Sequence, residues 1–509
     1  MRSRGLVVLA GVLAVVLVAG LTAGRLLRRS RNATAAEVAA AYFGAWRDGD
    51  LEDMRELVAG PPADFAAQHR ALSRGLRVNG IALEPRPVVA SGRDAATAEF
   101  TVTRSLADHG DWSFRSVLRL GRVGGRWRVL WSPSTLYPGL KGKGAWSLGQ
   151  VRVAAARPAA RDGGALPEDG LLAPYLAEII ANLDEDADQT GWAVELRDGN
   201  RPLRLVKVFG VKKTRTVRTT LDRSLQAAAE KAVAAASGQA AIVAVRPSSG
   251  EILAVADELG GLGAFTGLYP PGSTFKVVTA GALVADGAGA GTGADCPASV
   301  VTAQRTIRND DDHALGRTTL RGALAASCNT TFARLAVERL GAAKLAASAR
   351  RFGFGAPIAP GVGAARGGFP DPRSGAELAE AAIGQGRVQA SPLLMATVAA
   401  AVADGSRRAP RILPEKLIGE GGGERPRPVP GTPALRAMMR AVVIEGTAAS
   451  AGLPDAVAGK TGTAEFGGGS HAWFIGYRAG VAFAVFVSAG GSGPKVAAPL
   501  AARFLKAAG

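Results

Sequence analysis

The sequence predicts a multidomain α+β protein. The chain has 509 residues, several times the roughly 150 residues of a typical domain. Hydrophobic residues make up 47% and charged residues 20% of the chain, a balance that builds packed cores and excludes a disordered acidic tail, a coiled coil and a collagen-like rod. Stretches with helical spacing and stretches with strict alternation both occur, so we expect several units that combine helices and strands.

The charge balance and the few cysteines narrow the class of protein only partly. Lys and Arg total 61 against 43 Asp and Glu, giving a net charge of +18 that suits nucleic acid, an anionic membrane surface or an anionic polymer. The arginines are interleaved with Ala and Gly, so a general compositional bias explains the charge equally well. Two cysteines and four histidines exclude a disulfide-stapled mini-protein and a Cys-rich zinc site.

Residues 1–31 are expected to form a membrane anchor with basic flanks. Residues 5–24 are uncharged and apolar, and about 20 such residues in a helix cross the hydrocarbon core of a bilayer. The run is longer than the apolar part of a cleaved signal peptide, although Ala19 and Ala23 leave cleavage open. Basic residues flank both of its ends, so the positive-inside rule is nearly neutral on its orientation.

Residues 32–142 are expected to form a small α+β domain. Apolar residues recur near its start at helical spacing, namely Val38, Tyr42, Phe43 and Trp46. Alternating runs follow at 97–103, 112–120 and 126–131, and Gly124-Gly125 predicts a hairpin turn. We therefore expect a helix packed on a curved antiparallel sheet, with the aromatic residues in its core.

Residues 143–215 are expected to form a small linking domain. Arg157–Leu166 is rich in turn residues, Leu171–Leu183 suits a helix, and Trp192–Leu196 and Leu203–Val208 suit short strands.

Residues 216–509 are expected to form one large domain. Thr220 or Asp222 caps a helix that runs to about Ala236. A hairpin at 240–256 follows, then a mainly helical stretch from 274 to about 401 with Gly-rich loops, then strands at 456–463, 472–477 and 481–487, and a last helix. The sheet of this domain is thus assembled from both ends of its sequence.

Ser273 and Lys276 are candidates for a nucleophile and its base. Ser273-Thr274-Phe275-Lys276 is predicted to open an apolar helix, on which positions i and i+3 share one face, so the amine of Lys276 can reach the hydroxyl of Ser273. Backbone N–H groups at a helix start also favour developing negative charge. Alone, this pair is a weak signal, and a helix-capping serine followed by a surface lysine explains it about as well.

Two further motifs carry polar groups that suit the same chemistry. Ser327 and Asn329, two residues apart on a tight turn, can present a hydroxyl for proton relay and an amide for a peptide carbonyl. Lys460 lies in a predicted strand with three small residues that suit a carboxylate-bearing peptide lying alongside: Thr461 and Thr463 by their hydroxyls, and Gly462 by close approach of the backbones. A phosphate-binding loop at Gly459-Lys460-Thr461 is excluded because Pro454 replaces its first glycine.

The ordered set Ser273-x-x-Lys276, Ser327-x-Asn329 and Lys460-Thr461-Gly462 resembles the motifs of penicillin-binding proteins and serine β-lactamases. The flanking segments 269–276, 384–386, 446–448 and 472–477 look like the transpeptidase domain of class B penicillin-binding proteins. Residues 35–140 resemble the NTF2-like domain found at the start of some of these proteins. The resemblance implies an antiparallel sheet with helices on both sides, preceded by an NTF2-like domain and a short linking or pedestal domain.

The resemblance also implies a mechanism for a peptidoglycan D,D-transpeptidase. Ser273 would attack the bond between two D-alanines while neutral Lys276 takes its proton. Ser327, supported by Lys460, would protonate the leaving amine, and Asn329 would orient the peptide. Thr461 and Thr463 would hold the terminal carboxylate, and the backbone N–H groups of Ser273 and Thr463 would hold the oxyanion. No metal or organic cofactor is expected.

Other readings and partners follow from the same resemblance. The alternatives are a D,D-carboxypeptidase or a β-lactamase on the same fold, or a non-catalytic penicillin-binding sensor or scaffold. Expected partners are peptidoglycan stem peptides, β-lactams as covalent inhibitors, the membrane, and a glycan polymerase or division or elongation proteins; no nucleic acid is expected. The catalytic domain would lie outside the cytoplasm of a bacterium on a single-pass anchor, where Cys296 and Cys328 could either pair or stay free thiols.

Overall fold

The computed structural model describes residues 32–140, 145–154, 156–183, 188–198, 201–418 and 425–509, and it divides the chain into two compact units. The first unit combines the chain up to Val153 with Asp188–Lys213, and the second combines Ala154–Ala187 with Thr214–Gly509. The anchor expected at residues 5–24 lies outside the described residues. Within the described part of the chain, no helix has the length and apolarity that a membrane span requires.

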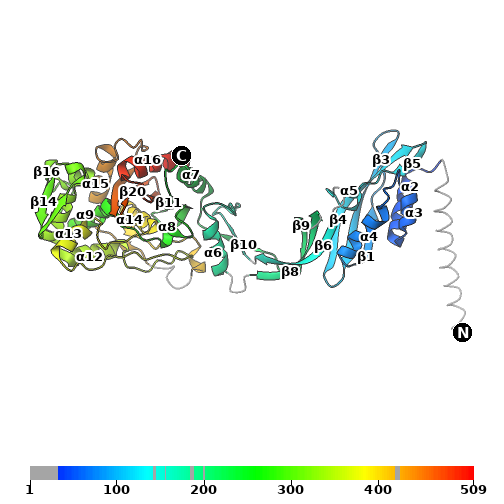
Figure 1. Ribbon diagram of the computed structural model, residues 1–509, viewed down its shortest axis with the longest axis horizontal. Helices are drawn as coiled ribbons and strands as arrows, with labels where there is room; N and C mark the ends of the chain where they lie inside the picture. Colours follow the sequence, from blue (N-terminus) through cyan, green and yellow to red (C-terminus); the bar gives the residue numbers. More distant parts are fainter. Residues whose placement is uncertain (1–31, 141–144, 155, 184–187, 199–200, 419–424) are drawn as a thin grey trace, which may run out of the picture. The chain divides into compact units, whose positions relative to one another are not determined.

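The first unit is an α+β structure with two sheets, of which the larger is antiparallel throughout. Its elements are α2 (Ala35–Asp48), α3 (Leu51–Glu56), α4 (Phe65–Gly75), β1 (Val78–Pro85), β2 (Val89–Ala90), β3 (Ala95–Leu106), β4 (Gly110–Val123), β5 (Arg126–Val129), α5 (Pro133–Leu136), β6 (Ala145–Ala154), β8 (Asp188–Asp198) and β9 (Arg201–Phe209). The larger sheet has the order β1-β3-β4-β5, with β2 beside β3, and the smaller one has the order β6-β8-β9. The predicted helix on an antiparallel sheet is confirmed (Figure 1).

Local sequence explains the first helix of this unit. The side chains of Thr34 and Glu37 each accept a hydrogen bond from the backbone N–H of the other residue, which is a capping box, and Gly49 ends α2 in the left-handed conformation at φ 73°. Tyr42, Phe43 and Trp46 are at most 4% exposed. The aromatic residues at helical spacing are therefore core residues, as predicted.

A buried arginine lies inside the same unit. Arg104 is on the inner face of β3, is 1% exposed, and its Nε and Nη1 have no hydrogen-bond partner among the described residues. Burial lowers the pKa of Arg104 to about 10. A buried charge with so few partners costs free energy that an apolar side chain of similar length does not.

We therefore expect Arg104→Met to stabilise the first unit by about 1–3 kcal/mol. Urea unfolding of the full chain, followed by tryptophan fluorescence, measures this change, because every tryptophan except Trp473 lies in the first unit. Arg115→Met, at an exposed position of β4, is the matched control and should leave the midpoint nearly unchanged. A lower midpoint for Arg104→Met would contradict the argument.

Residues 143–215, expected to form a linking domain, are shared between the two units. Strands β6, β8 and β9 belong to the first unit, and their pairing brings Asp188–Asp198 next to Ala145–Ala154. β7 (Ala156–Ala159), α6 (Ala173–Leu183) and β10 (Arg215–Arg218) belong to the second unit, where β7 and β10 pair in parallel. The chain thus passes from the first unit to the second, back, and into the second again.

The second unit contains one five-stranded sheet and a block of helices. The first part of its sequence forms α7 (Arg223–Val233), β11 (Ala240–Val245), β12 (Ile252–Asp257), α8 (Gly263–Thr266), the 3-10 turn η1 (Gly272–Phe275), α9 (Lys276–Ala285), β13 (Gly293–Cys296), β14 (Ser299–Thr302), β15 (Arg305–Arg308), η2 (Asp310–Asp312) and β16 (Gly316–Thr319). The rest forms α10 (Leu320–Ala325), α11 (Asn329–Leu335), η3 (Ala336–Leu340), α12 (Gly341–Phe352), α13 (Gly375–Ala382), α14 (Pro392–Asp404), β17 (Ser406–Arg407), η4 (Glu415–Leu417), β18 (Arg427–Pro428), α15 (Thr432–Ile444), β19 (Ala458–Phe466), β20 (Gly469–Arg478), β21 (Val481–Val487), η5 (Gly493–Ala497) and α16 (Ala498–Ala508).

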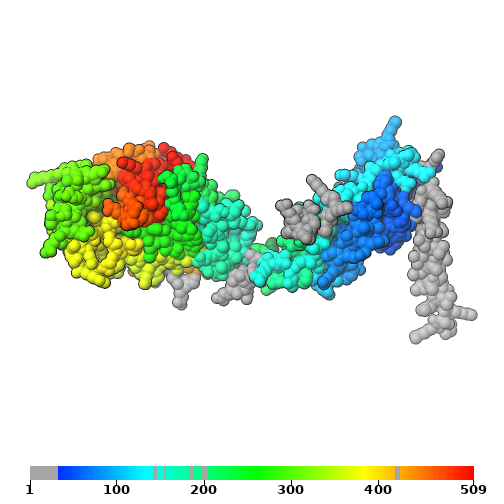
Figure 2. Space-filling model, in the orientation of Figure 1, coloured from blue at the N-terminus to red at the C-terminus, as the bar shows by residue number. Residues whose placement is uncertain are grey.

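The sheet of the second unit is assembled from both ends of its sequence, as predicted. Its order is β12-β11-β21-β20-β19, with every neighbouring pair antiparallel. Figure 2 accordingly shows the C-terminal residues, in red, beside the green surface around residue 250. Every residue of β11 and β12 is buried, because α7, α16 and α14 pack against the sheet.

The stretch from 274 to 401 differs from the prediction in one respect. It is helical over most of its length, but residues 293–319 form two short hairpin-like pairs, β13 with β16 and β14 with β15. Each of these strands has four residues, which is too short to show the alternating pattern from which strands are predicted. This small β region contacts the start of α11 and so lies beside the candidate site.

Candidate active site

Ser273 lies on a tight turn that rests against strand β19. The structure places it within the 3-10 turn η1, and the α-helix α9 begins only at Lys276, three residues later than the sequence suggested. Gly272 precedes it with φ +52°, and a Cβ there would come within 2.5 Å of the carbonyl oxygen of Thr463. Only glycine allows this approach, which holds the half-buried Ser273 against the strand.

Lys276 is the hub of the polar cluster. Its Nζ lies 2.9 Å from Ser273 Oγ, 2.6 Å from the carbonyl oxygen of Ser327, 3.2 Å from Ser327 Oγ and 2.6 Å from Asn329 Oδ1. The side chain is fully buried. An amine in this place can take the proton of the Ser273 hydroxyl when the oxygen attacks an electrophile.

Ser327 joins this amine to a second one. The residue has φ +60°, a left-handed backbone conformation that residues other than glycine seldom adopt. Its Oγ accepts a hydrogen bond from Lys460 Nζ at 2.9 Å, across 133 residues of sequence. The side-chain amide of Asn329 makes two hydrogen bonds within the protein. Its Oδ1 accepts from Lys276 Nζ, and its Nδ2 donates to the carbonyl of Arg308 at 2.9 Å.

The Lys-Thr-Gly-Thr segment lies in β19 at the edge of the sheet. Thr461 is buried and its hydroxyl pairs with that of Thr447 at 2.6 Å, whereas the half-buried Thr463 accepts a hydrogen bond from the N–H of Gly493 at 3.2 Å. A Cβ on Gly462 would come within 2.8 Å of Thr274 Cγ2. In the structure, Gly462 therefore admits the turn of Ser273, and the close approach of a peptide at Gly462 stays a prediction.

Both lysines have a pKa below the ordinary value for a lysine side chain. Burial first, and then the positive charge of Lys460, bring the pKa of Lys276 well below its ordinary value, against the opposing effect of Asp310. Burial lowers the pKa of Lys460 to about 7. A lowered pKa increases the fraction of a lysine that is neutral and able to accept a proton, which is the property that a base for Ser273 requires.

The structure thus brings together five of the predicted residues, Ser273, Lys276, Ser327, Asn329 and Lys460. Thr447 and Asn309 were not assigned a role from the sequence. Thr447 belongs to a motif that the sequence offered only by its resemblance, and Asn309 lies in the short β region that no pattern revealed. The question left open for the cysteines is answered, since Cys296 and Cys328 form a disulfide.

Comparison with protein families agrees with this geometry. Residues 240–506 match the model of the penicillin-binding protein transpeptidase domain, and residues 34–144 match that of the NTF2-like N-terminal transpeptidase domain. The first match alone covers more than half of the chain.

Individual relatives share part of the chain. The peptidoglycan D,D-transpeptidase PbpA of Mycobacterium tuberculosis is 34% identical over 277 residues, which are 47% of this chain and 55% of that protein. The penicillin-binding protein PbpB of Mycolicibacterium smegmatis is 30% identical over 294 residues, 49% of this chain and 45% of that protein. The chain therefore spans about half the length of the curated relatives it matches.

Solved structures give the same assignment. The D,D-transpeptidase domain of a peptidoglycan glycosyltransferase from Eggerthella lenta has a TM-score of 0.56 and 27% identity, with 70% of this chain and 98% of that chain covered. PBPA from M. tuberculosis has a TM-score of 0.51 and 28% identity, with 58% and 80% covered. On its motifs, fold, site geometry and relatives, the chain belongs to the penicillin-binding protein transpeptidase family.

Proposed function

We propose that the chain is a peptidoglycan D,D-transpeptidase, which cross-links stem peptides through an acyl-enzyme on Ser273 and is acylated by β-lactams. The observation that carries the proposal is the pair of buried amines, with Lys276 Nζ 2.9 Å from Ser273 Oγ and Lys460 Nζ 2.9 Å from Ser327 Oγ. This arrangement supplies one base for the nucleophile and a separate relay for the leaving group. PBPA from M. tuberculosis is known as acyl-enzyme complexes with penicillin G and ceftriaxone, which supports the same chemistry.

In the first step, the oxygen of Ser273 attacks the carbonyl carbon between the two terminal D-alanines. The O–H bond of Ser273 breaks as its proton passes to neutral Lys276, and the carbonyl π electrons move to the oxygen. The backbone N–H groups of Ser273 and Thr463 accommodate this oxyanion, a contribution of about 3–4 kcal/mol for one donor in other acyl-transfer enzymes. Ser273 and Thr463 lie close to each other because Gly272, the residue before Ser273, packs against the carbonyl of Thr463.

In the second step, the carbon–nitrogen bond breaks and the terminal D-alanine leaves. Its amine takes a proton from the Ser327 hydroxyl, which is replenished through Lys276 or Lys460, both of which contact Ser327 Oγ. The amine of a neighbouring stem peptide then attacks the ester, and the same groups carry its proton in reverse. The product is a peptide cross-link, and Ser273 regains its proton.

The terminal carboxylate of the donor peptide is assigned to Thr463 and Thr461. Thr463 Oγ1 accepts a hydrogen bond from Gly493, so its O–H remains a donor. Thr461 is 2% exposed and bonded to Thr447, so its contribution runs through that hydroxyl pair. Asn329 is assigned the role of orienting the peptide. One N–H of its side-chain amide donates to the carbonyl of Arg308, and the other N–H would donate to the peptide.

The proposed location is the outer side of a bacterial cell membrane, with residues 5–24 as a single-pass anchor. The disulfide between Cys296 and Cys328 supports a compartment outside the cytoplasm, because such bonds persist under oxidising conditions. A glycan polymerase and division or elongation proteins are the partners that a cross-linking enzyme of this kind requires.

Two parallel incubations, one with a stem-peptide thioester and one with a β-lactam, test the activity and separate the alternatives. The full chain is incubated with a stem-peptide thioester and a D-amino acid, and products are resolved by mass. Exchange of the thiol for the amino acid is the expected result. Hydrolysis alone indicates a carboxypeptidase, rapid turnover of a β-lactam indicates a β-lactamase, and a stable acyl-enzyme without either product indicates a sensor.

Burial first and the charge of Lys460 second lower the pKa of Lys276, so the charge of Lys460 should influence the pH dependence of acylation. Lys276 acts as a base only when neutral, so the rate rises as the pH passes upward through its pKa. Because the positive charge of Lys460 lowers the pKa of Lys276, Lys460→Met should raise that pKa and move the acid limb of the profile to higher pH. Stopped-flow acylation by penicillin across the pH range measures the limb.

Lys506→Met is the control for this experiment, because Lys506 is an exposed lysine on α16. Its profile should coincide with that of the wild type. An acid limb for Lys460→Met that stays in place or moves to lower pH would show that Lys460 does not act on the base.

A further inference from the structure

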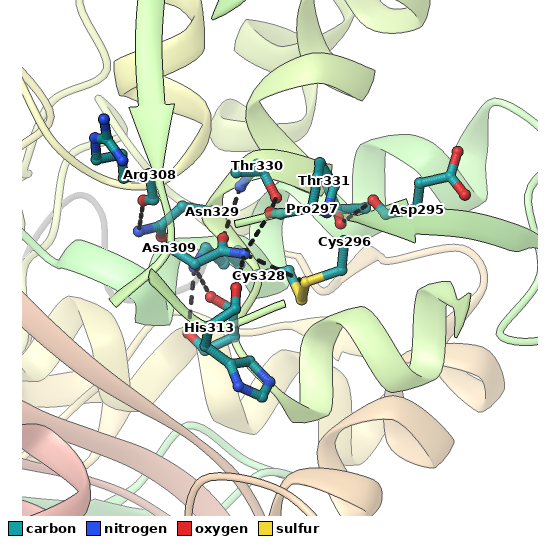
Figure 3. The surroundings of a disulfide bond; sticks show 12 residues. Asp295, Cys296, Pro297, Arg308, Asn309, His313, Cys328, Asn329, Thr330 and Thr331 are labelled. Atoms are coloured by element: carbon teal, nitrogen blue, oxygen red, sulfur yellow. Dashed lines mark hydrogen bonds between the residues drawn. A yellow bond between two sulfur atoms is a disulfide. The ribbon is translucent and has the colours of Figure 1, made fainter. Parts of the chain in front are cut away.

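The turn that carries Ser327 and Asn329 is fastened to one neighbouring segment, residues 295–309, which we call the clamp segment. Four successive residues make the attachments, as Figure 3 shows. Cys328 forms the disulfide with Cys296, and Asn329 Nδ2 donates a hydrogen bond to the carbonyl of Arg308. Thr330 donates from its backbone N–H to Asn309 Oδ1 and from its hydroxyl to the carbonyl of Pro297. Thr331 Oγ1 donates to the carbonyl of Asp295.

Asn309 is the polar centre of the clamp segment. Its side chain is 7% exposed, and its Oδ1 accepts from the N–H of Thr330 at 3.1 Å. Its Nδ2 donates to the carbonyls of Pro297 at 2.8 Å and His313 at 2.7 Å, and lies 3.4 Å from Cys296 Sγ. One amide therefore links the start of α11, the disulfide and the β region.

The turn needs such support because of its own conformation. Ser327 is held at φ +60°, which an L side chain adopts only where the surroundings enforce it. From that conformation, its carbonyl and hydroxyl oxygens reach Lys276, and its hydroxyl reaches Lys460. The disulfide leaves from the next residue, so a relaxed turn would move both catalytic contacts at once.

We propose that Cys296, Cys328 and Asn309 are positioning residues for acylation, holding the Ser327 turn in the geometry in which it contacts both lysines. The inference rests on the proposed function, because acylation of Ser273 is its readout. The cysteines take no part in proton transfer: both are at most 1% exposed, and their sulfurs are bonded to each other. Their effect reaches the reaction only through the place of Ser327 and Asn329.

The test is the double variant Cys296→Ala/Cys328→Ala in the full chain. Acylation by benzylpenicillin is followed by stopped flow over a range of concentrations, which separates the binding constant from the acylation rate constant. The rate constant should fall on the order of tenfold to 100-fold, as expected for a misplaced catalytic group, while the binding constant changes little.

A pH profile separates positioning from general loss of stability. Lys460 and Asp310 are the charged groups that act on Lys276, and burial is the largest influence. A relaxed turn admits water to Lys276, so the acid limb should move to higher pH. Phe504→Leu, which removes contacts of a buried ring on α16 with Phe483, is the control: it should lower thermal stability and leave both the rate constant and the acid limb in place.

Asn309→Ala provides a second variant that keeps the disulfide, for use if the double variant does not fold. It should lower the acylation rate constant in the same way, because it frees the N–H of Thr330. A wild-type rate constant and acid limb in either folded variant overturn the proposal, as does a loss no larger than that of Phe504→Leu. Failure of the wild type itself to be acylated would instead overturn the proposed function.

Discussion

Ser273→Ala is expected to abolish covalent labelling of the protein by a fluorescent penicillin. The alanine lacks the oxygen that forms the ester, and loss of the nucleophile in another serine acyl-transfer enzyme costs on the order of 10⁶-fold in rate. The fold should survive, because Ser273 is half-buried and the substitution removes one hydrogen bond, the bond from Lys276. Gel fluorescence after incubation, with circular dichroism as the check on folding, measures the outcome.

Ser249→Ala is the matched control, because Ser249 is also half-buried but lies in the hairpin turn between β11 and β12. It should label as the wild type does. Ser327 is the competing nucleophile to consider, because its Oγ contacts both Lys276 and Lys460. If Ser273→Ala still labels, mass analysis of the modified peptide identifies the true nucleophile, and Ser273 loses its assigned role.

Ser327→Ala should behave differently from Ser273→Ala. It removes the proposed proton relay and leaves Ser273 and Lys276 in place, so the label should form more slowly and remain on Ser273. This contrast separates the two serines, which the sequence distinguishes only by the motifs around them.

The pairing of Ser273 with Lys276, the proposed nucleophile and base, could be predicted from the sequence because their contact is local. Ser273 and Lys276 are three residues apart, and even the replacement of an α-helix by a 3-10 turn at Ser273 leaves their side chains 2.9 Å apart. The contact between Ser327 and Lys460 is different, since it joins residues 133 apart and depends on the whole path of the helical block. Only the resemblance to a family predicted it.

Other features had no local signal. The left-handed conformation of Ser327 is imposed by the surroundings, and nothing in the residue type indicates it. The four short strands β13 to β16 lack periodicity, and the pairing of the two cysteines depends on where those strands lie. The division of residues 143–215 between two units likewise follows from the pairing of β6 with β8, which is a tertiary contact.

Lys276→Met is expected to lower the acylation rate by roughly 10²- to 10⁴-fold, the usual contribution of a general base. Methionine keeps the length of the side chain and removes the amine. Removing the amine also leaves the carbonyl oxygen of Ser327 and Oδ1 of Asn329 without their donor, which should lower the free energy of unfolding by about 1–3 kcal/mol for each unsatisfied acceptor. Urea unfolding measures that loss, and the acylation rate is measured below the unfolding transition, where the variant is still folded.

Lys276→Arg distinguishes a base from a hydrogen-bond donor. A guanidinium keeps its proton at any ordinary pH, so it can still donate toward Ser327 and Asn329 but cannot accept the proton of Ser273. If Lys276 serves as the base, both variants lose acylation. If Lys276 only holds the turn of Ser327 in place, a folded Lys276→Arg variant keeps much of the rate and Lys276→Met does not, and the base must then be sought in Lys460.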